Sequence, residues 1–118
     1  MSRARALIVV AVLVVFVIGG GILIYATRSH GGQNVSINLN VTGGTKMTPD
    51  NPTANQNDKV TINVTSDTEG EVHLHGYDIP FEVKAGETVS HTFTADKTGS
   101  FVIEWETTSA ELGHLVVS

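Results

Sequence analysis

Cysteine is absent from this chain of 118 residues. Its absence excludes disulfide bonds, thiolate metal sites, cysteine nucleophiles and a lipid-modified N-terminal cysteine. A folded domain of this chain must therefore bury enough apolar surface to be stable without covalent cross-links.

Basic residues are also few, since seven Lys and Arg stand against twelve Asp and Glu. All twelve acidic residues and only four lysines follow residue 28, so that part of the chain carries a formal charge near −8. Nucleic-acid-binding domains contact phosphates with clusters of Lys and Arg. We therefore expect no nucleic-acid partner.

Only one long apolar run is present, from Ala6 to Ala26. It is uncharged, and its 21 residues match the ~20 that a helix needs to cross a bilayer. Arg3 and Arg5 precede the run and Arg28 follows it. The positive-inside tendency then places the N-terminus in the cytoplasm and the rest of the chain outside.

A cleaved signal peptide is the alternative interpretation of this run. Its apolar region is ordinarily about 7–15 residues long and is followed by a small-x-small cleavage site. The run here is longer, and Leu23-Ile24-Tyr25-Ala26 lacks the required small residue. We therefore expect a single-pass cell-membrane protein. The expected parts are a cytoplasmic N-terminus and signal-anchor transmembrane helix in 1–28, a linker in 29–34 and an extracytoplasmic domain in 35–118. The membrane is then one partner, and a membrane or periplasmic protein is a candidate second one.

Helical periodicity is missing after residue 28, where apolar and polar residues alternate instead. Alternation is typical of strands with one buried face. Turn-forming residues separate about seven such segments at the spacing of about 8–12 residues typical of sandwiches. The sequence predicts an all-β domain, an antiparallel two-sheet sandwich, with strands near 35–41, 60–64, 71–75, 79–83, 89–93, 101–105 and 112–117.

Several motifs of these segments occur in an order known from one family. The stretch 57–61 (Asn-Asp-Lys-Val-Thr) is similar to a turn and strand written Gly-Asp-x-Val, and 85–89 (Ala-Gly-Glu-Thr-Val) is similar to a later turn. The segment 72–78 lies where this family places its first histidine ligand, and 93–101 is similar to its penultimate hairpin. The chain from Asn57 onwards thus resembles the cupredoxins, small β-sandwiches best known as blue-copper electron carriers. The resemblance implies a Greek-key sandwich.

The resemblance does not extend to the copper ligands. A blue-copper site needs a cysteine thiolate, two histidines and usually a weak axial methionine. In the family, the cysteine and then His and Met follow the strand after that hairpin. The corresponding region here, Phe101 to His114, contains no cysteine, and no methionine occurs after Met47. Composition therefore excludes blue-copper electron transfer.

His73 and His75 are the residues best suited to hold a metal. Two residues apart on a strand, they leave the same face about 6.6–6.8 Å apart. Imidazoles at this spacing can converge on one Cu(II) or Zn(II) ion with bonds near ~2.0 Å. We predict His114 as the third ligand, because it follows the loop in which cupredoxins keep their remaining ligands. Other candidates for the third donor are His91, Asp78, Glu104 and Glu106.

Strand parity supports an alternative without metal. Val72 and Leu74 lie on the face opposite the two histidines, and only one face can be the core. If the apolar pair points inward, the histidines lie on the outer surface and could simply be part of a polar sheet face.

Three classes of function therefore remain. The first is an anchored cupredoxin-like domain that binds or hands on copper or another divalent metal. The second is a metal-free sandwich that serves as a protein-interaction module at the cell surface. The third is a metallo-enzyme, but the sequence shows no nucleophile–base pair and no three-ligand spacing. We expect that the protein is not an enzyme.

Overall fold

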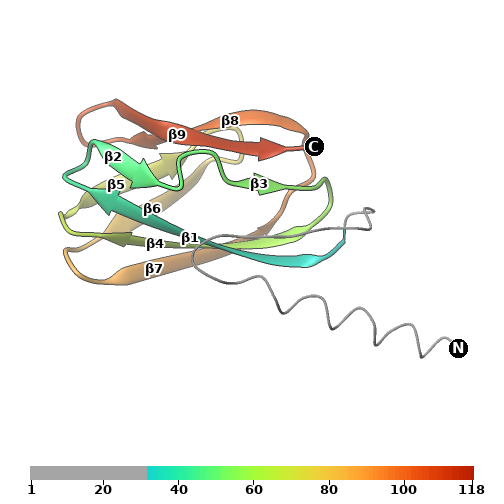
Figure 1. The fold of residues 1–118 in the computed structure, drawn as a ribbon, viewed down its shortest axis with the longest axis horizontal. Helices are drawn as coiled ribbons and strands as arrows, with labels where there is room; N and C mark the ends of the chain where they lie inside the picture. The colour runs from blue at the N-terminus through green and yellow to red at the C-terminus, as the bar shows by residue number, and fades with distance from the viewer. Residues whose placement is uncertain (1–31) are drawn as a thin grey trace, which may run out of the picture.

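The computed structural model describes residues 32–118, which form two β-sheets packed face to face (Figure 1). No helix occurs within this range, so none there could span a membrane. The predicted anchor in residues 1–28 lies outside the described residues. The strands are β1 (Asn34–Thr42), β2 (Lys46–Thr48), β3 (Thr53–Ala54), β4 (Lys59–Ser66), β5 (Gly70–Leu74), β6 (Ile79–Val83), β7 (Thr88–Thr94), β8 (Gly99–Trp105) and β9 (Ala110–Val117).

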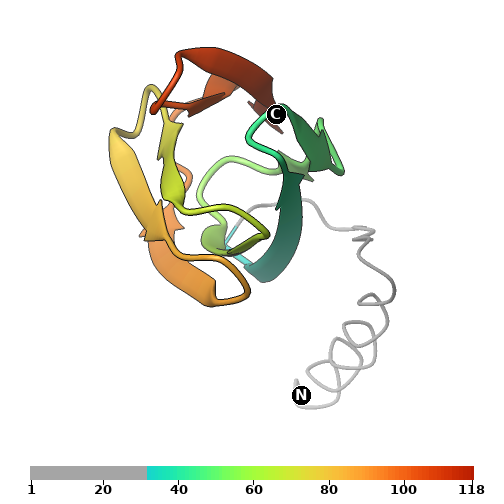
Figure 2. The same cartoon turned by 90° about the vertical axis from the view of Figure 1, so that its left-hand side faces the viewer.

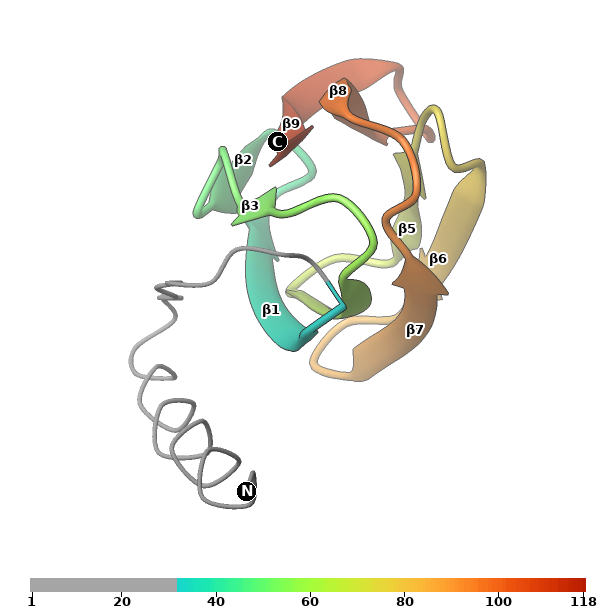
Figure 3. The same ribbon diagram turned by 90° about the vertical axis from the view of Figure 1, so that its right-hand side faces the viewer.

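The first sheet has the strand order β2-β1-β4-β7, and the second has the order β3-β9-β8-β5-β6. Seen from one end of the molecule, the two sheets curve around a shared interior (Figure 2). From the other end, β6 of one sheet and β7 of the other lie side by side along one flank (Figure 3). The second sheet carries His73 on β5 and His114 on β9, and His75 directly follows β5.

Side chains from both sheets fill this interior. The alternation that predicted the strands is the alternation of burial: Val60, Ile62 and Val64 of β4 are buried, while the residues between them are partly exposed. The largest fully buried apolar side chains are Phe81, Leu39, Ile62, Leu74, Ile103 and Leu115, and Trp105 also belongs to the core. Burial of this apolar surface is the main stabilising contribution in a domain without cross-links.

The all-β prediction is confirmed for residues 32–118, but the prediction of purely antiparallel sheets is wrong. β1 pairs with β4 in parallel, in register from Asn34↔Lys59 to Val41↔Ser66, and β3 pairs with β9 in parallel. After β1 the chain passes through β2 and crosses to the other sheet as β3 before β4 returns beside β1. Alternation reveals which side chains are buried and carries no information about the direction of the partner strand.

Candidate metal centre

The two histidines of the His-x-His motif lie on the outer face of the second sheet. Val72 and Leu74 of β5 are buried in the core, which turns His73 outward between them, and His75 follows directly at the strand end. The side chain of His73 is 17% exposed and that of His75 is 42% exposed. Val72 and Leu74 thus point inward and the two histidines point outward, the arrangement considered from strand parity. Neighbouring side chains nevertheless cover much of both rings.

The two imidazoles converge on one point. His73 Nδ1 lies 3.4 Å from His75 Nε2, and the ring centroids are 4.4 Å apart with the ring planes nearly perpendicular, at 81°. Glu106, which directly follows β8, places Oε1 3.8 Å from His73 Nδ1. One potential ligand atom from each of His73, His75 and Glu106 lies within 4.8 Å of the other two. Glu106, one of the third donors considered from the sequence, thus completes a group of three.

Two further carboxylates hold the rings in place. Asp78 Oδ1 lies 2.9 Å from His73 Nε2, and Glu104 Oε1 lies 2.6 Å from His75 Nε2. Asp78 reaches His73 from the turn between β5 and β6, where its backbone has a positive φ of 58°. An imidazole that donates Nε2–H to Asp78 keeps the Nδ1 lone pair free. His73 can therefore direct Nδ1 at the point that it shares with His75 and Glu106.

His114, the predicted third ligand, lies elsewhere on the same face. It belongs to β9, opposite Val102 of β8, and β8 separates β9 from β5. Its Nε2 lies 3.2 Å from Glu111 Oε2. A register shift between Ile103 and Glu104 explains this contact, because the extra residue of the bulge brings positions 111 and 114 to one face. The structure therefore pairs His114 with Glu111 and does not bring it into the group around His73.

His91 is likewise separate from the group. It lies on β7 of the other sheet and is exposed, with its ring edge-on to Phe81 at a centroid distance of 4.9 Å. His91, a candidate third donor from the sequence, is therefore on the last strand of the first sheet and not beside His73 and His75.

The structure also shows why a blue-copper site does not fit this chain. The strand that would lead to the missing thiolate is β8, which ends in Trp105, a residue only 3% exposed. Its indole packs so closely against Gly44 and Gly70 that a Cβ at either glycine would overlap the ring. The methionine within residues 32–118 is Met47, which is buried, whereas the histidines lie on the outer face. No soft sulfur donor is therefore available to them.

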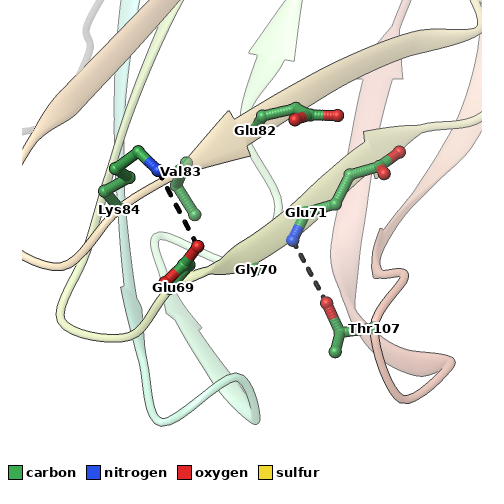
Figure 4. A pocket seen from close by; sticks show the side chains of 7 residues that line it. All are labelled: Glu69, Gly70, Glu71, Glu82, Val83, Lys84 and Thr107. Atoms are coloured by element: carbon green, nitrogen blue, oxygen red, sulfur yellow. Dashed lines mark hydrogen bonds and ion pairs between the residues drawn. The ribbon is translucent and has the colours of Figure 1, made fainter.

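A hollow in the described part of the chain adjoins β5 but holds none of these histidines (Figure 4). It has a volume of about 280 Å³, below the range of about 300–1,000 Å³ typical of small-molecule sites. Lys84 Nζ lies 3.8 Å from Glu69 Oε2, and the amide of Glu71 donates to Thr107 Oγ1 across the hollow. We therefore assign the candidate chemistry to the histidine group and not to this hollow.

The two outer faces of the sandwich differ in charge. That of the first sheet has no Asp or Glu on β1, β4 or β7 and carries uncharged rows such as Asn38–Asn63–Ser90 that hydrogen-bond across it. The second sheet instead carries carboxylates around its histidines: Glu71, Glu82, Glu104, Glu106 and Glu111. Cations are therefore attracted to the face that holds His73 and His75, within a screening length of about 8–10 Å at ordinary salt.

No protein-family model and no curated protein matches the chain. Among solved structures, a copper binding protein in the apo form superposes with a TM-score of 0.62 at 17% identity, over 77% of this chain and 93% of that one. Auracyanin A, a "blue" copper protein from Chloroflexus aurantiacus, gives a TM-score of 0.53 at 17% identity, over 72% and 99% of the two chains.

A laccase from Botrytis aclada gives a TM-score of 0.60 at 16% identity, over 77% of this chain and only 23% of the laccase. Identities this low establish the shared fold and leave the ligands and activity to be argued from this chain's own residues. The order of motifs, the two packed sheets and these superpositions agree: the described part of the chain has a cupredoxin-like fold.

Proposed function

We propose that this protein is a membrane-anchored, extracytoplasmic cupredoxin-like domain that binds copper or another divalent metal, and hands it on, without blue-copper electron transfer. The observation that carries the proposal is the convergence of His73, His75 and Glu106, whose potential ligand atoms lie within 4.8 Å of one another. We take these three residues as the ligands.

The donor set suits this chemistry. Two imidazole nitrogens and a carboxylate oxygen are ligands that Cu(II) and Zn(II) both accept, and copper binds such a set more tightly than zinc. Asp78 supports His73 as carboxylates support metal-bound histidines elsewhere, by accepting a hydrogen bond from the nitrogen that is not a ligand. The site is partly open, since the side chain of Glu106 is 46% exposed, and an open site allows metal to enter and leave.

Protons compete with the metal at this site. Glu104 Oε1 lies 2.6 Å from His75 Nε2, so metal binding at this nitrogen must displace the proton of that hydrogen bond. We therefore expect metal affinity to fall as the pH is lowered, because protons and the metal compete for the same ligand atoms. The same hydrogen bonds also support the alternative, a metal-free interaction module, because they pair both rings without an ion. The binding experiment has to separate the two.

That experiment is a titration of the full chain in detergent with Cu(II) and Zn(II). We expect a Kd of about 1 µM or lower for Cu(II), which corresponds to about 8 kcal/mol. A His73→Ala/His75→Ala double variant should lose this binding, and its outward positions make misfolding a small risk. Equally weak binding by both proteins would refute the metal proposal and leave the interaction module.

Two single variants test which residue is the third ligand. Glu106→Gln keeps the shape of the side chain and removes its charge, so affinity should fall about tenfold. His114→Ala removes the ligand predicted from the sequence and should leave affinity within about twofold, because β8 separates β9 from β5. The reverse result would restore His114 and remove Glu106 from the site.

The anchor and its orientation rest on the apolar run and its flanking arginines. The lack of cysteine provides a direct test, because a single introduced cysteine is then the only thiol. A membrane-impermeant maleimide should label Ser118→Cys in intact cells and should label Ser2→Cys only after lysis. Labelling of Ser2→Cys alone in intact cells would reverse the orientation, and recovery in the soluble fraction would refute the anchor.

A further inference from the structure

The donor atoms of the candidate metal centre are all nitrogen or oxygen. The outer face around His73 and His75 supplies carboxylates and imidazoles, and the methionine of the described range, Met47, is buried beneath β9, where its methyl group lies near Gly113. Soft thiolate and thioether ligands favour Cu(I), whereas imidazole and carboxylate sets favour Cu(II). A carboxylate ligand adds to this preference because it stabilises the doubly charged ion more than the singly charged one.

We infer that this is a Cu(II)-selective site that releases its copper on one-electron reduction. The inference rests on the proposed function and assigns the oxidation state that the site takes and the event that empties it. One electron from an external reductant, such as ascorbate or a quinol, converts bound Cu(II) to Cu(I). The metal–ligand bonds break, a proton from solvent restores the hydrogen bond between His75 Nε2 and Glu104, and the Cu(I) passes to a softer acceptor.

The neighbours of the two rings favour such release. Glu104 Oε1 lies 2.6 Å from His75 Nε2, the nitrogen that faces the shared point, so this imidazole has a hydrogen-bond partner as soon as the metal leaves. Glu104 is 20% exposed and is fixed on β8, opposite His73 on β5. A buried or half-buried nitrogen without a partner would raise the free energy of the empty site. The structure provides that partner in advance.

The preference has a measurable size. We expect the Kd of the full chain for Cu(II) to be about a thousandfold lower than its Kd for Cu(I). At about 59 mV per tenfold for one electron, this ratio lowers the reduction potential of the bound metal by about 180 mV. A blue-copper site, with its soft sulfur ligands, is built for the opposite preference.

The test compares both oxidation states on the full chain in detergent. Cu(II) affinity is measured by competition with a nitrogen–oxygen chelator, and Cu(I) affinity is measured anaerobically against a Cu(I)-specific chelator. Ascorbate is then added to the Cu(II)-loaded protein in the presence of the Cu(I) chelator. We expect complete transfer of the copper, with the protein itself chemically unchanged.

Two substitutions at one position make the test specific. Glu106→Gln should weaken Cu(II) binding about tenfold and change Cu(I) binding by less than about twofold. Glu106→Met supplies a thioether at the same place, so Cu(I) affinity should rise at least about tenfold while Cu(II) affinity falls. The same two changes at Glu87, an exposed residue in the turn between β6 and β7, are the matched controls and should alter neither affinity.

The outcomes separate the inference from the proposed function. Cu(II) binding with equal or tighter Cu(I) binding, or retention of copper after ascorbate, would overturn the inference and leave the proposed site standing. If the His73→Ala/His75→Ala variant binds neither Cu(II) nor Cu(I), while the Glu87 variants bind both, the location of the site is confirmed. Failure of the wild-type chain to bind Cu(II) would refute the proposed function itself.

Discussion

Asp78 Oδ1 lies 2.9 Å from His73 Nε2, and the other nitrogen of the same ring faces His75 and Glu106. A carboxylate that accepts Nε2–H from this ring favours the tautomer in which the Nδ1 lone pair is free. Asp78 contacts the ring and not the shared point, which makes it a positioning residue.

Replacement of this carboxylate should weaken metal binding without unfolding the protein. Asp78→Asn keeps a side chain that tolerates the positive φ of 58° and removes the negative charge. Loss of such an outer carboxylate typically costs about 10–100-fold in metal affinity, and we expect about tenfold because Asp78 is 91% exposed. The measurement is Cu(II) titration at several pH values.

If Asp78 positions His73, the free energy of unfolding of Asp78→Asn without metal should stay within about 0.5 kcal/mol of wild type, while the pH profile of metal binding shifts. A purely structural role would instead lower the free energy of unfolding. Asp96→Asn, a similar change outside the site, is the matched control. Unchanged metal affinity in Asp78→Asn would contradict the positioning role.

Gly70 packs closely against Trp105 near the site, and this contact gives a second prediction. A Cβ at Gly70 would overlap the indole ring and crowd Thr107 Oγ1. We expect Gly70→Ala to lower the free energy of unfolding by about 1–3 kcal/mol, the usual cost of overpacking. Trp105 is the only tryptophan of the chain, so its fluorescence reports the change directly.

A double variant isolates the cause. Trp105→Phe shortens the ring, so the added methyl of Gly70→Ala should cost less in that background, with a coupling of about 0.5–3 kcal/mol. Additive effects of the two changes would show that backbone conformation, and not the ring, requires glycine here.

Asp58 is a buried carboxylate that satisfies two backbone amides. It is 1% exposed, its Oδ1 accepts from the amide of Gln33 at 3.1 Å, and its Oδ2 accepts from the amide of Asn55 at 2.9 Å. Asp58→Ala leaves both donors without a partner, so we expect a loss of about 2–4 kcal/mol. Urea unfolding should show a lower midpoint with an unchanged slope, and Asp58→Asn should lose less. Equal losses in both variants would indicate a role for the charge alone.

Asp67 predicts an acid dependence of stability. The amide of Gly43 and the hydroxyl of Thr68 donate to its Oδ1, each at 2.8 Å, and the Gly43 hydrogen bond is the larger cause of its lowered pKa. Because the pKa of Asp67 is lower in the folded state, its ionised carboxylate stabilises the fold. This contribution is fully present above the unfolded-state pKa of about 3.9 and is lost as the pH falls through the folded-state pKa.

The difference in stability between wild type and Asp67→Asn should therefore be largest near neutral pH and should vanish at strongly acidic pH. Denaturant unfolding at pH 7, 4 and 2.5 measures it. A difference that stays constant or grows as the pH falls would contradict the assignment to the ionised carboxylate.

The sequence predicted the local features of the fold. Alternating Val and Ile in 60–64 and the pair Val72 and Leu74 fixed which side chains are buried, because a strand of a two-layer fold can bury only one face. The direction of the neighbouring strand cannot be predicted from alternation, and the parallel β1–β4 pair was missed for that reason. The short β2 and β3 lie between the strands predicted near 35–41 and 60–64 and were not predicted, since two or three residues are too few to show a period.

The same division applies to the metal centre. The spacing of His73 and His75 gave their common face from the sequence, because two residues along a strand return to one side of the sheet. The third donor depends on contacts between strands that are far apart in the chain: the pairing of β5 with β8 brings Glu104 and Glu106 beside the histidines, and a bulge in β9 turns His114 toward Glu111. Composition by itself determined that no thiolate can lie beside the histidines; only the tertiary structure decided which carboxylates do, because register is set by packing across the whole sheet.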